Sequence, residues 1–174
     1  DVVWQSRRLG RYAAAVERLP TYECFCTRRE IAEAASAPQG DGYRPYPGTC
    51  AGLGERERAE RRSIRQPALR VRAGGVIQTV TDVLAGEVTG VVDDFVVVRN
   101  DGVPAYNLAV VVDDVAQEVA QVVRGDDLAS SAPRQRHLAT LLGLPPVRYA
   151  HVPLVLGPGG ARLAKRDGAT TLED

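Results

Sequence analysis

The sequence predicts an α/β layered domain in which helices cover a sheet of strands. Amphipathic and charge-rich helical patterns fill the first third of the chain, and β-branched residues dominate from Leu69 onward. Glycine and proline residues punctuate these segments, and strands mixed with helices favour the layered class. The chain has 174 residues, of which 44% are hydrophobic, so it can bury one substantial core.

Four segments are expected to form helices, at residues 6–19, 27–37, 55–65 and 131–142. In the first, apolar residues recur at spacings of three and four until Pro20. Thr27 and Glu30 form a capping-box pattern that opens the second. The third is so dense in charges that much of it should be solvated. Ser131 caps the fourth, and Gly143 ends it.

Five runs rich in β-branched residues are expected to form strands, at residues 69–73, 76–80, 95–99, 106–112 and 152–156. A sixth run, 119–123, could be a buried strand or the end of a helix that begins at Val115. Residues 100–102, Asn-Asp-Gly, are a turn signal. The fourth run ends in the paired acids Asp113 and Asp114, which we expect to be mostly structural.

The composition excludes several classes of protein. The net charge is zero, so no global field draws the chain onto nucleic acid or a membrane. No run approaches 18 apolar residues and no charged-then-apolar leader opens the sequence, so we expect no membrane partner and no export signal. We therefore expect a cytoplasmic monomer. The chain has no methionine and begins abruptly at Asp1, which indicates a piece of a longer protein.

Three cysteines, Cys24, Cys26 and Cys50, form a candidate metal site. An odd number of cysteines without a secretory signal argues against a disulfide framework. Cys24 and Cys26 are also too close in the sequence to bridge each other comfortably. Three thiolates suit zinc, and we expect a closed site with a structural role. The alternative is three buried free thiols that pack as small hydrophobic groups.

A structural zinc site needs a fourth ligand, and neither histidine lies near the cysteines in the sequence. Tyr46, four residues before Cys50, could complete the tetrahedron if metal binding ionises its phenol. Glu23 and Asp41 are the carboxylate alternatives. The residues alone leave this choice open.

Three side chains could form a site for a small anionic ligand. Lys165 is the one lysine among 22 basic residues, and a compact, flexible ammonium suits contact with phosphates. Arg124 ends an apolar run, where ligands gather in open α/β sheets, and could clamp a carboxylate through two parallel hydrogen bonds. Tyr106 could offer its hydroxyl to the same ligand. The alternatives are a surface lysine and an ion pair of Arg124 with Asp126 or Asp114.

The two histidines are expected to be packing residues. His137 falls in the middle of a predicted helix, and His151 lies in an apolar stretch before Pro153. A serine–histidine triad would need an elbow motif that this sequence lacks. We therefore assign neither histidine a catalytic role.

Residues 55–72 carry a local excess of positive charge that could grip RNA phosphates. They contain three glutamates and seven arginines, at Arg56, Arg58, Arg61, Arg62, Arg65, Arg70 and Arg72. Aromatic residues are not interleaved with them, so the alternative is a solvated helix face. A non-catalytic, zinc-stabilised RNA-binding module is therefore one hypothesis for the function.

Taken together, these segments resemble the glutamyl-tRNA synthetase family, and within it most closely the short paralogues called glutamyl-Q tRNA(Asp) synthetases. The residues that carry the resemblance are 22–26, 46–50, 69–73, 94–99, 101–114, 123–128, 133–135, 151–154 and 162–166. The last segment, Arg-Leu-Ala-Lys-Arg, resembles the lysine–methionine–serine–lysine–serine loop of class I synthetases. The match covers nearly the whole chain in the family's order, which is more specific than any single motif.

The resemblance implies a class I aminoacyl-tRNA synthetase-like Rossmann catalytic domain, its C-terminal portion, with an inserted zinc-binding segment. Residues 1–20 would be a helix of the nucleotide-binding domain and 21–72 the zinc-binding and connecting insertion. Residues 73–174 would be the second half of the Rossmann-like domain, with the lysine loop at 162–166. The family's N-terminal half, with its histidine–isoleucine–glycine–histidine type loop, does not match any part of the chain. We therefore expect these residues alone not to form an adenylate at a useful rate.

The resemblance also implies roles for single residues. Lys165 would be catalytic, because it would bind ATP phosphates and stabilise the charge that develops as pyrophosphate leaves. Tyr106 and Arg124 would bind glutamate. Structural zinc would be held by Cys24, Cys26, Tyr46 and Cys50.

The function that the resemblance implies is ATP-dependent activation of glutamate, with magnesium, and its transfer to the queuosine base of tRNA(Asp). The Tyr-x-x-x-Cys spacing and Asn107 favour the short paralogues, because full-length synthetases more often have Cys-x-His and a histidine at these places. The alternative enzyme is a standard glutamyl-tRNA synthetase that charges tRNA(Glu).

Overall fold

The computed structural model describes residues 2–34 and 45–157. The helical elements in these ranges are η1 (Gln5–Arg7), α1 (Leu9–Glu17), α2 (Arg28–Ala34), α3 (Glu55–Arg62), α4 (Tyr106–Ala116), η2 (Asp126–Ser131) and α5 (Ala132–Leu141). The strands are β1 (Thr21–Cys24), β2 (Ala68–Val71), β3 (Val76–Asp82), β4 (Gly86–Val92), β5 (Val96–Val98), β6 (Gln121–Gly125) and β7 (Arg148–Val152). Helices and strands are mixed, which confirms the predicted α/β class. No helix of the described ranges is long and apolar enough to cross a membrane.

The strands form two sheets. One is antiparallel, in the order β1-β2-β5, and the other is mixed, in the order β4-β3-β7-β6. In the mixed sheet, β7 runs parallel to both β3 and β6. The carboxyl ends of β3, β6 and β7 therefore lie at one edge of the sheet, where open α/β sheets bind their ligands.

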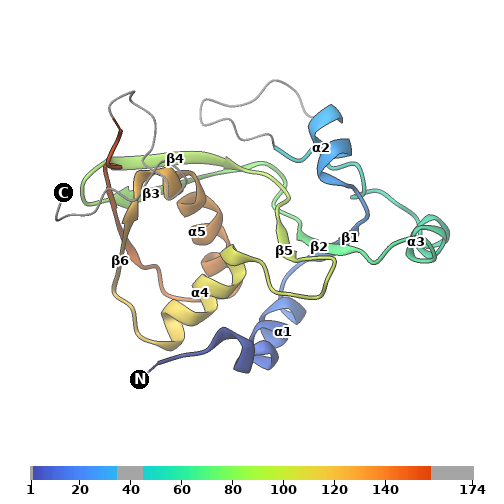
Figure 1. Cartoon of the computed structure of the whole chain (residues 1–174), viewed down its shortest axis with the longest axis horizontal. Helices are drawn as coiled ribbons and strands as arrows, with labels where there is room; N and C mark the ends of the chain where they lie inside the picture. The colour runs from blue at the N-terminus through green and yellow to red at the C-terminus, as the bar shows by residue number, and fades with distance from the viewer. Residues whose placement is uncertain (1, 35–44, 158–174) are drawn as a thin grey trace.

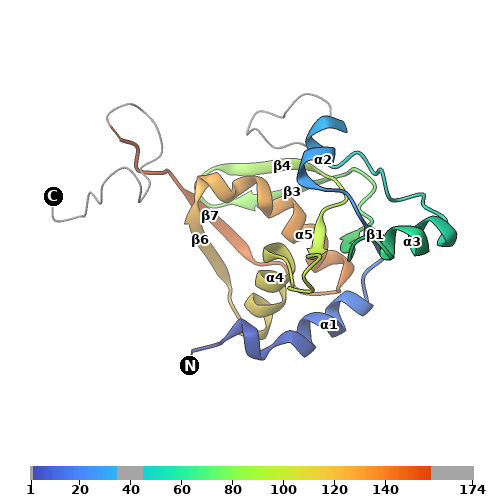
Figure 2. The same ribbon diagram turned by 45° about the vertical axis from the view of Figure 1, so that its right-hand side comes forward.

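The helices α4 and α5 connect the two sheets (Figures 1 and 2). α5 packs against β3 and β4, α4 packs against α5 and β5, and α1 covers α4 from the other side. The antiparallel sheet contains β1 and β2, which lie in the expected insertion at residues 21–72, and β5, which lies in the expected second half of the domain at residues 73–174.

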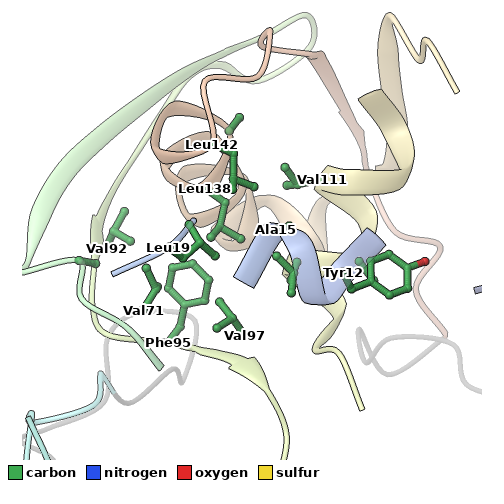
Figure 3. Close-up of a cluster of buried hydrophobic side chains, with 14 residues drawn as sticks. Tyr12, Ala15, Leu19, Val71, Val92, Phe95, Val97, Val111, Leu138 and Leu142 are labelled. Carbon is green, nitrogen blue, oxygen red and sulfur yellow. The ribbon is translucent and has the colours of Figure 1, made fainter. Parts of the chain in front are cut away.

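The main core lies where these elements meet (Figure 3). Leu138 of α5 and Leu142, which directly follows α5, are almost fully buried and face Val111 of α4. Tyr12 of α1 and Phe95, which follows β4, close the cluster. Burial of these apolar side chains is the main favourable contribution that holds helices and sheets together.

Most predicted elements are confirmed, with small shifts at their ends. The helices predicted at 6–19, 55–65 and 131–142 correspond to α1, α3 and α5. The strands predicted at 69–73, 76–80 and 95–99 correspond to β2, β3 and β5, and of the two alternatives left open for 119–123 the structure has the strand, β6. The sequence did not predict β1 or β4. The turn at 100–102 is confirmed, with Gly102 in the left-handed region at φ 78°.

The strand predicted at residues 106–112 is wrong, because this run forms the helix α4. Leu108, Ala109 and Val111 are buried at helical spacing against α1 and α5. A continuous apolar run does not distinguish a buried helix from a buried strand, so the preference of valine for strands was misleading. Packing between layers overrides that weak local preference.

The strand predicted at residues 152–156 is also wrong. β7 spans Arg148–Val152 instead, and the sheet pairing ends before Pro153. Proline has no N–H to donate to a neighbouring strand, so the pairing stops there. Val155 and Leu156 beyond it are exposed, at 72% and 57%.

The capping box predicted for α2 is confirmed. The Glu30 amide donates to the Thr27 hydroxyl oxygen, and the Thr27 amide donates to the Glu30 carboxylate. We expect Thr27→Ala to lower the local stability of α2 by about 1 kcal/mol, because it removes one of these partners. Amide hydrogen exchange in α2 measures this. Thr140→Ala, at the exposed end of α5, is the matched control and should change stability by less than about 0.5 kcal/mol; equal effects would contradict the capping role.

Candidate functional site

The three cysteines come together although Cys50 is far from the other two in the sequence. Cys24 ends β1, Cys26 follows it, and Cys50 lies in the turn before α3. Their Sγ atoms all lie within 4.8 Å of one another, and those of Cys26 and Cys50 are 3.5 Å apart. Around one zinc ion with tetrahedral Zn–S bonds the sulfurs would be roughly 3.8 Å apart, so this cluster fits the ion.

The Tyr46 hydroxyl completes the cluster. Its oxygen lies 3.4 Å from the Cys24 sulfur and 3.7 Å from the Cys26 sulfur, and it accepts the Cys50 amide N–H at 2.9 Å. Burial, together with hydrogen bonds to the thiols, raises the pKa of Tyr46, so the phenol stays neutral unless a cation ionises it. Three sulfurs and one oxygen therefore converge, which is the predicted donor set.

Two of the donors near Tyr46, Cys24 and Cys26, differ in how easily they ionise. Burial opposes ionisation of Cys24, but its hydrogen bonds with Tyr46 and Arg70 outweigh burial and lower the pKa of this thiol. The Arg70 guanidinium also lies 3.7 Å from the centroid of the Tyr46 ring. Burial raises the pKa of Cys26 to about 12, so this thiolate needs a neighbouring cation.

The carboxylate alternatives for the fourth ligand do not gain support. Side chains alternate along β1, and Glu23 lies on the face opposite to Tyr22 and Cys24. Its carboxylate instead accepts hydrogen bonds from Arg62 of α3 at 2.6 and 2.8 Å. Asp41 lies outside the described residues.

Two consecutive acids after β4 anchor the cysteine segment, and the sequence did not indicate them. Asp93 accepts the Tyr46 amide N–H at 2.9 Å and the Arg134 guanidinium of α5 at 3.1 Å. Asp94 accepts the Tyr22 hydroxyl at 2.7 Å and the Ala73 amide at 2.8 Å. These bonds link the segment to both α5 and the mixed sheet.

Tyr106 and Arg124, predicted to share a ligand, lie together at the ends of α4 and β6. The Arg124 Nη1 donates to the Tyr106 hydroxyl oxygen at 3.3 Å. Its Nη2 donates to the Leu128 carbonyl at 3.2 Å, and its Nε donates to Nε2 of His151 at 3.0 Å. These three partners carry no formal negative charge, so the guanidinium remains suited to an anionic ligand.

His151 packs in the interior as predicted, but the sequence did not indicate its contact with Arg124. Its side chain is fully buried, and its ring stacks on Tyr149 with the centroids 5.8 Å apart. Nδ1 lies 2.6 Å from a carboxylate oxygen of Asp82, at the end of β3. Burial opposes ionisation of Asp82, but amide N–H groups and His151 outweigh it and lower the pKa of Asp82 to about 2. The parallel pairing of β6 with β7, which the sequence does not specify, sets Arg124 opposite His151.

The other candidate residues lie elsewhere. Lys165 is outside the described residues. Asp113 is buried in α4, where it accepts the Tyr12 hydroxyl at 2.7 Å and pairs with Arg8 at 3.1 Å, so its predicted structural role is confirmed. His137 is buried in α5, and burial lowers its pKa, as expected of a packing residue.

Several arginines of the basic segment already have partners. Arg56 and Arg58 pair with glutamates of α3, and Arg62 pairs with Glu55 as well as with Glu23. These contacts reduce the charge excess that the segment presents. They favour the solvated helix face for α3 over an RNA-binding surface.

Comparison with known proteins identifies the family of this chain. The family model described as tRNA synthetases class I (E and Q), catalytic domain, matches residues 1–174. A glutamyl-Q tRNA(Asp) synthetase of Nocardia farcinica is 61% identical over 178 residues, which cover 99% of this chain and 57% of that protein. One of Cutibacterium acnes is 58% identical over 173 residues, covering 99% of this chain and 50% of that protein. The chain thus spans about half the length of these relatives.

Solved structures share the fold. The glutamate–tRNA synthetase of Elizabethkingia anophelis superposes with a TM-score of 0.75 at 26% identity, over 94% of this chain and 37% of that one. A glutamate tRNA ligase of Elizabethkingia meningosepticum, in complex with its amino acid, gives 0.74 at 26% identity, over 94% and 36%. Since the family model matches the chain from end to end, the chain belongs to the class I tRNA synthetases of the glutamate and glutamine group, within their catalytic domain.

Proposed function

We propose that this chain contributes the amino-acid site and a structural zinc site to an enzyme that activates glutamate with ATP. The intact protein would form glutamyl-adenylate and transfer glutamate to the queuosine base of tRNA(Asp). The observation that carries the proposal is the contact between Arg124 Nη1 and the Tyr106 hydroxyl at 3.3 Å, at the carboxyl edge of the sheet. The similarity to glutamyl-Q tRNA(Asp) synthetases supports the choice of acceptor.

Activation consumes the α-carboxylate of glutamate, because one of its oxygens attacks the α-phosphorus of ATP. The carboxylate held by Arg124 is therefore the side-chain one, which does not react. Two parallel hydrogen bonds fix that carboxylate, and the Tyr106 hydroxyl orients the amino acid beside it. This arrangement favours glutamate over glutamine, since the amide of glutamine offers one acceptor oxygen instead of two.

Pyrophosphate leaves as the new acyl–phosphate bond forms, and no covalent enzyme intermediate is needed. Lys165 would stabilise the negative charge that grows on the leaving group. Magnesium, when bound with ATP, neutralises phosphate charge. The residues of this chain contribute positioning and electrostatic stabilisation, which together can lower a barrier by several kcal/mol.

Zinc would be held by Cys24, Cys26, Tyr46 and Cys50. Four protein ligands leave no open coordination position, so the metal would stabilise the segment at residues 21–72 and take no part in the reaction. A hollow of about 490 Å³ beside this segment is lined in part by Arg28 and Arg65. We propose that tRNA phosphates lie near these two arginines. Since ATP and tRNA are the proposed substrates, we propose that the protein works in the cytoplasm. We also propose that it is a monomer.

Glutamate-dependent exchange of pyrophosphate into ATP tests the function. We expect the natural full-length protein to catalyse this exchange without tRNA, and residues 1–174 alone to give no exchange above background. Robust turnover by residues 1–174 would contradict the proposal that adenylate formation also needs the family's N-terminal half. Exchange that does not depend on glutamate would reject the function itself. Transfer assays with tRNA(Asp) and tRNA(Glu) then separate the short paralogue from a standard glutamyl-tRNA synthetase.

A further inference from the structure

We propose that Asp82 and His151 are positioning residues for the glutamate site. Asp82 fixes His151 in the tautomer that carries its proton on Nδ1, and His151 in turn fixes the Arg124 guanidinium through Nε2. The inference rests on the proposed function and deepens it, because it explains how the sheet orients the group that recognises the substrate carboxylate.

The three residues come from three adjacent strands. Arg124 of β6 lies opposite His151 of β7 in the parallel register, and Asp82 of β3 lies opposite Tyr149, two residues before His151. The Asp82 carboxylate also accepts the His151 backbone N–H at 3.0 Å, in addition to the ring contact at 2.6 Å. The order of the strands therefore places Asp82 in contact with His151, and His151 in contact with Arg124 at the proposed glutamate site.

The hydrogen-bond donors determine the tautomer. An arginine side chain has N–H donors and no acceptor, so the His151 Nε2 that lies 3.0 Å from Arg124 Nε must accept. A neutral imidazole with an accepting Nε2 carries its proton on Nδ1, and that proton points at the Asp82 carboxylate. Protonation of both nitrogens would place two N–H groups face to face. Asp82 thus selects the one form of His151 that can bind Arg124.

Both His151 and Asp82 are shielded from water. The side chains of His151 and Asp82 are fully buried, and the carboxylate also accepts the amides of Leu84 and Ala85 at 2.9 and 2.8 Å. The ring of His151 is stacked on Tyr149, and the Arg124 guanidinium carbon lies 5.3 Å from the centroid of the same ring. The imidazole therefore has little freedom to rotate, and its acceptor stays aimed at Arg124.

The N–H donors of Arg124 that have no protein partner determine how it can bind a ligand. Arg124 has five N–H donors, and His151, Tyr106 and the Leu128 carbonyl use three of them. The two that remain belong to Nη1 and Nη2, one on each. Two N–H groups on the two terminal nitrogens are the donors that a bidentate carboxylate requires. The contact with His151 through Nε leaves these two donors free.

A matched pair of substitutions in the natural full-length protein tests the inference. His151→Gln places a carbonyl oxygen near the position of Nε2, so it keeps an acceptor for Arg124. His151→Asn reaches only to the position of Nδ1, so it keeps a donor for Asp82 and loses that acceptor. We expect the glutamine variant to stay within about 3-fold of the wild-type KM for glutamate. We expect the asparagine variant to raise this KM by about 10- to 100-fold, with the KM for ATP unchanged.

A merely structural role would not separate these two variants, because both replace the ring by a shorter polar side chain. Equal KM values for glutamate in the two variants, or parallel losses for glutamate and ATP, would overturn the inference. A wild-type protein that shows no dependence on glutamate would instead reject the proposed function, and the inference with it.

The tautomer has its own readout. In the natural full-length protein with ¹⁵N-labelled histidine, we expect the Nδ1 of His151 to show the shift of a protonated nitrogen and Nε2 that of an unprotonated one. Asp82→Asn presents an amide N–H₂ to Nδ1 and should reverse this pattern. A wild-type spectrum with the proton on Nε2 would overturn the inference even if the kinetic variants fail to fold.

Discussion

Replacing Arg124 by glutamine is expected to weaken glutamate binding by about 100-fold, which corresponds to about 2.7 kcal/mol. The substitution removes the positive charge and the two parallel N–H donors that would hold the substrate's side-chain carboxylate, and hydrogen bonds to charged groups contribute about 1.5–3 kcal/mol each. Isothermal titration of the natural full-length protein with glutamate measures the loss. The variant should also lose most of its preference for glutamate over glutamine.

Three further variants make this test specific. Arg124→Lys keeps the charge but not the fork or the Nε bond to His151, so we expect a loss of about 10-fold. Tyr106→Phe removes one neutral hydroxyl and should cost about 10-fold or less. Arg148→Gln, at the exposed start of β7, is the matched control and should leave binding unchanged. An Arg124→Gln variant that binds glutamate as tightly as wild type would show that the carboxylate lies elsewhere.

Replacing Cys50 by serine is expected to abolish stoichiometric zinc binding and to unfold the segment around β1. Structural zinc contributes about 10 kcal/mol or more in small zinc-dependent folds, so loss of one of four ligands removes much of the free energy that holds this segment folded. The Cys50 side chain is 1% exposed, and its loss also disturbs the packing around Tyr22 and Phe25. Elemental analysis gives the zinc content, and the melting temperature should fall together with it.

Tyr46→Phe tests the fourth ligand separately, because it keeps the ring and removes the oxygen. We expect the zinc affinity, measured by competition with a chelator, to fall by more than about 10-fold. Tyr22→Phe is the matched control: it removes a buried hydroxyl that donates to Asp94, so it should lower stability and leave zinc affinity intact. Full zinc affinity in Tyr46→Phe would show that another group completes the site.

The sequence was most informative where a local pattern has one physical meaning. The capping box at Thr27 and Glu30 predicts where α2 begins, and the apolar residues at spacings of three and four predict α1. The cysteine cluster could be predicted because thiolates at this spacing have few other uses outside a disulfide framework. The near-continuous apolar run of α4 fits two structures equally well, and only the packing of α1 and α5 against it decides between them.

The contacts behind the proposed amino-acid site could not be predicted from the sequence. Asp82 and His151 are 69 residues apart, and no local pattern links them. Their contact depends on the register of parallel strands, which is fixed by packing of the whole sheet rather than by any nearby turn. The sequence predicted correctly that His151 is a packing residue, and it predicted Arg124 as a site residue. The hydrogen bond between them could be identified only from the folded structure.

The buried bond between Asp93 and Arg134 also constrains how such a chain can diverge. Either residue alone cannot be exchanged for an apolar one without leaving its partner's charge inside the protein, at a cost of about 3–5 kcal/mol. Replacing both together avoids the unpaired charge, but the Tyr46 amide N–H then loses its acceptor. A substitution at one of the two positions should therefore be accompanied by one at the other, and the Tyr46 backbone amide, which donates to the same Asp93 carboxylate, links the cysteine segment to this pair.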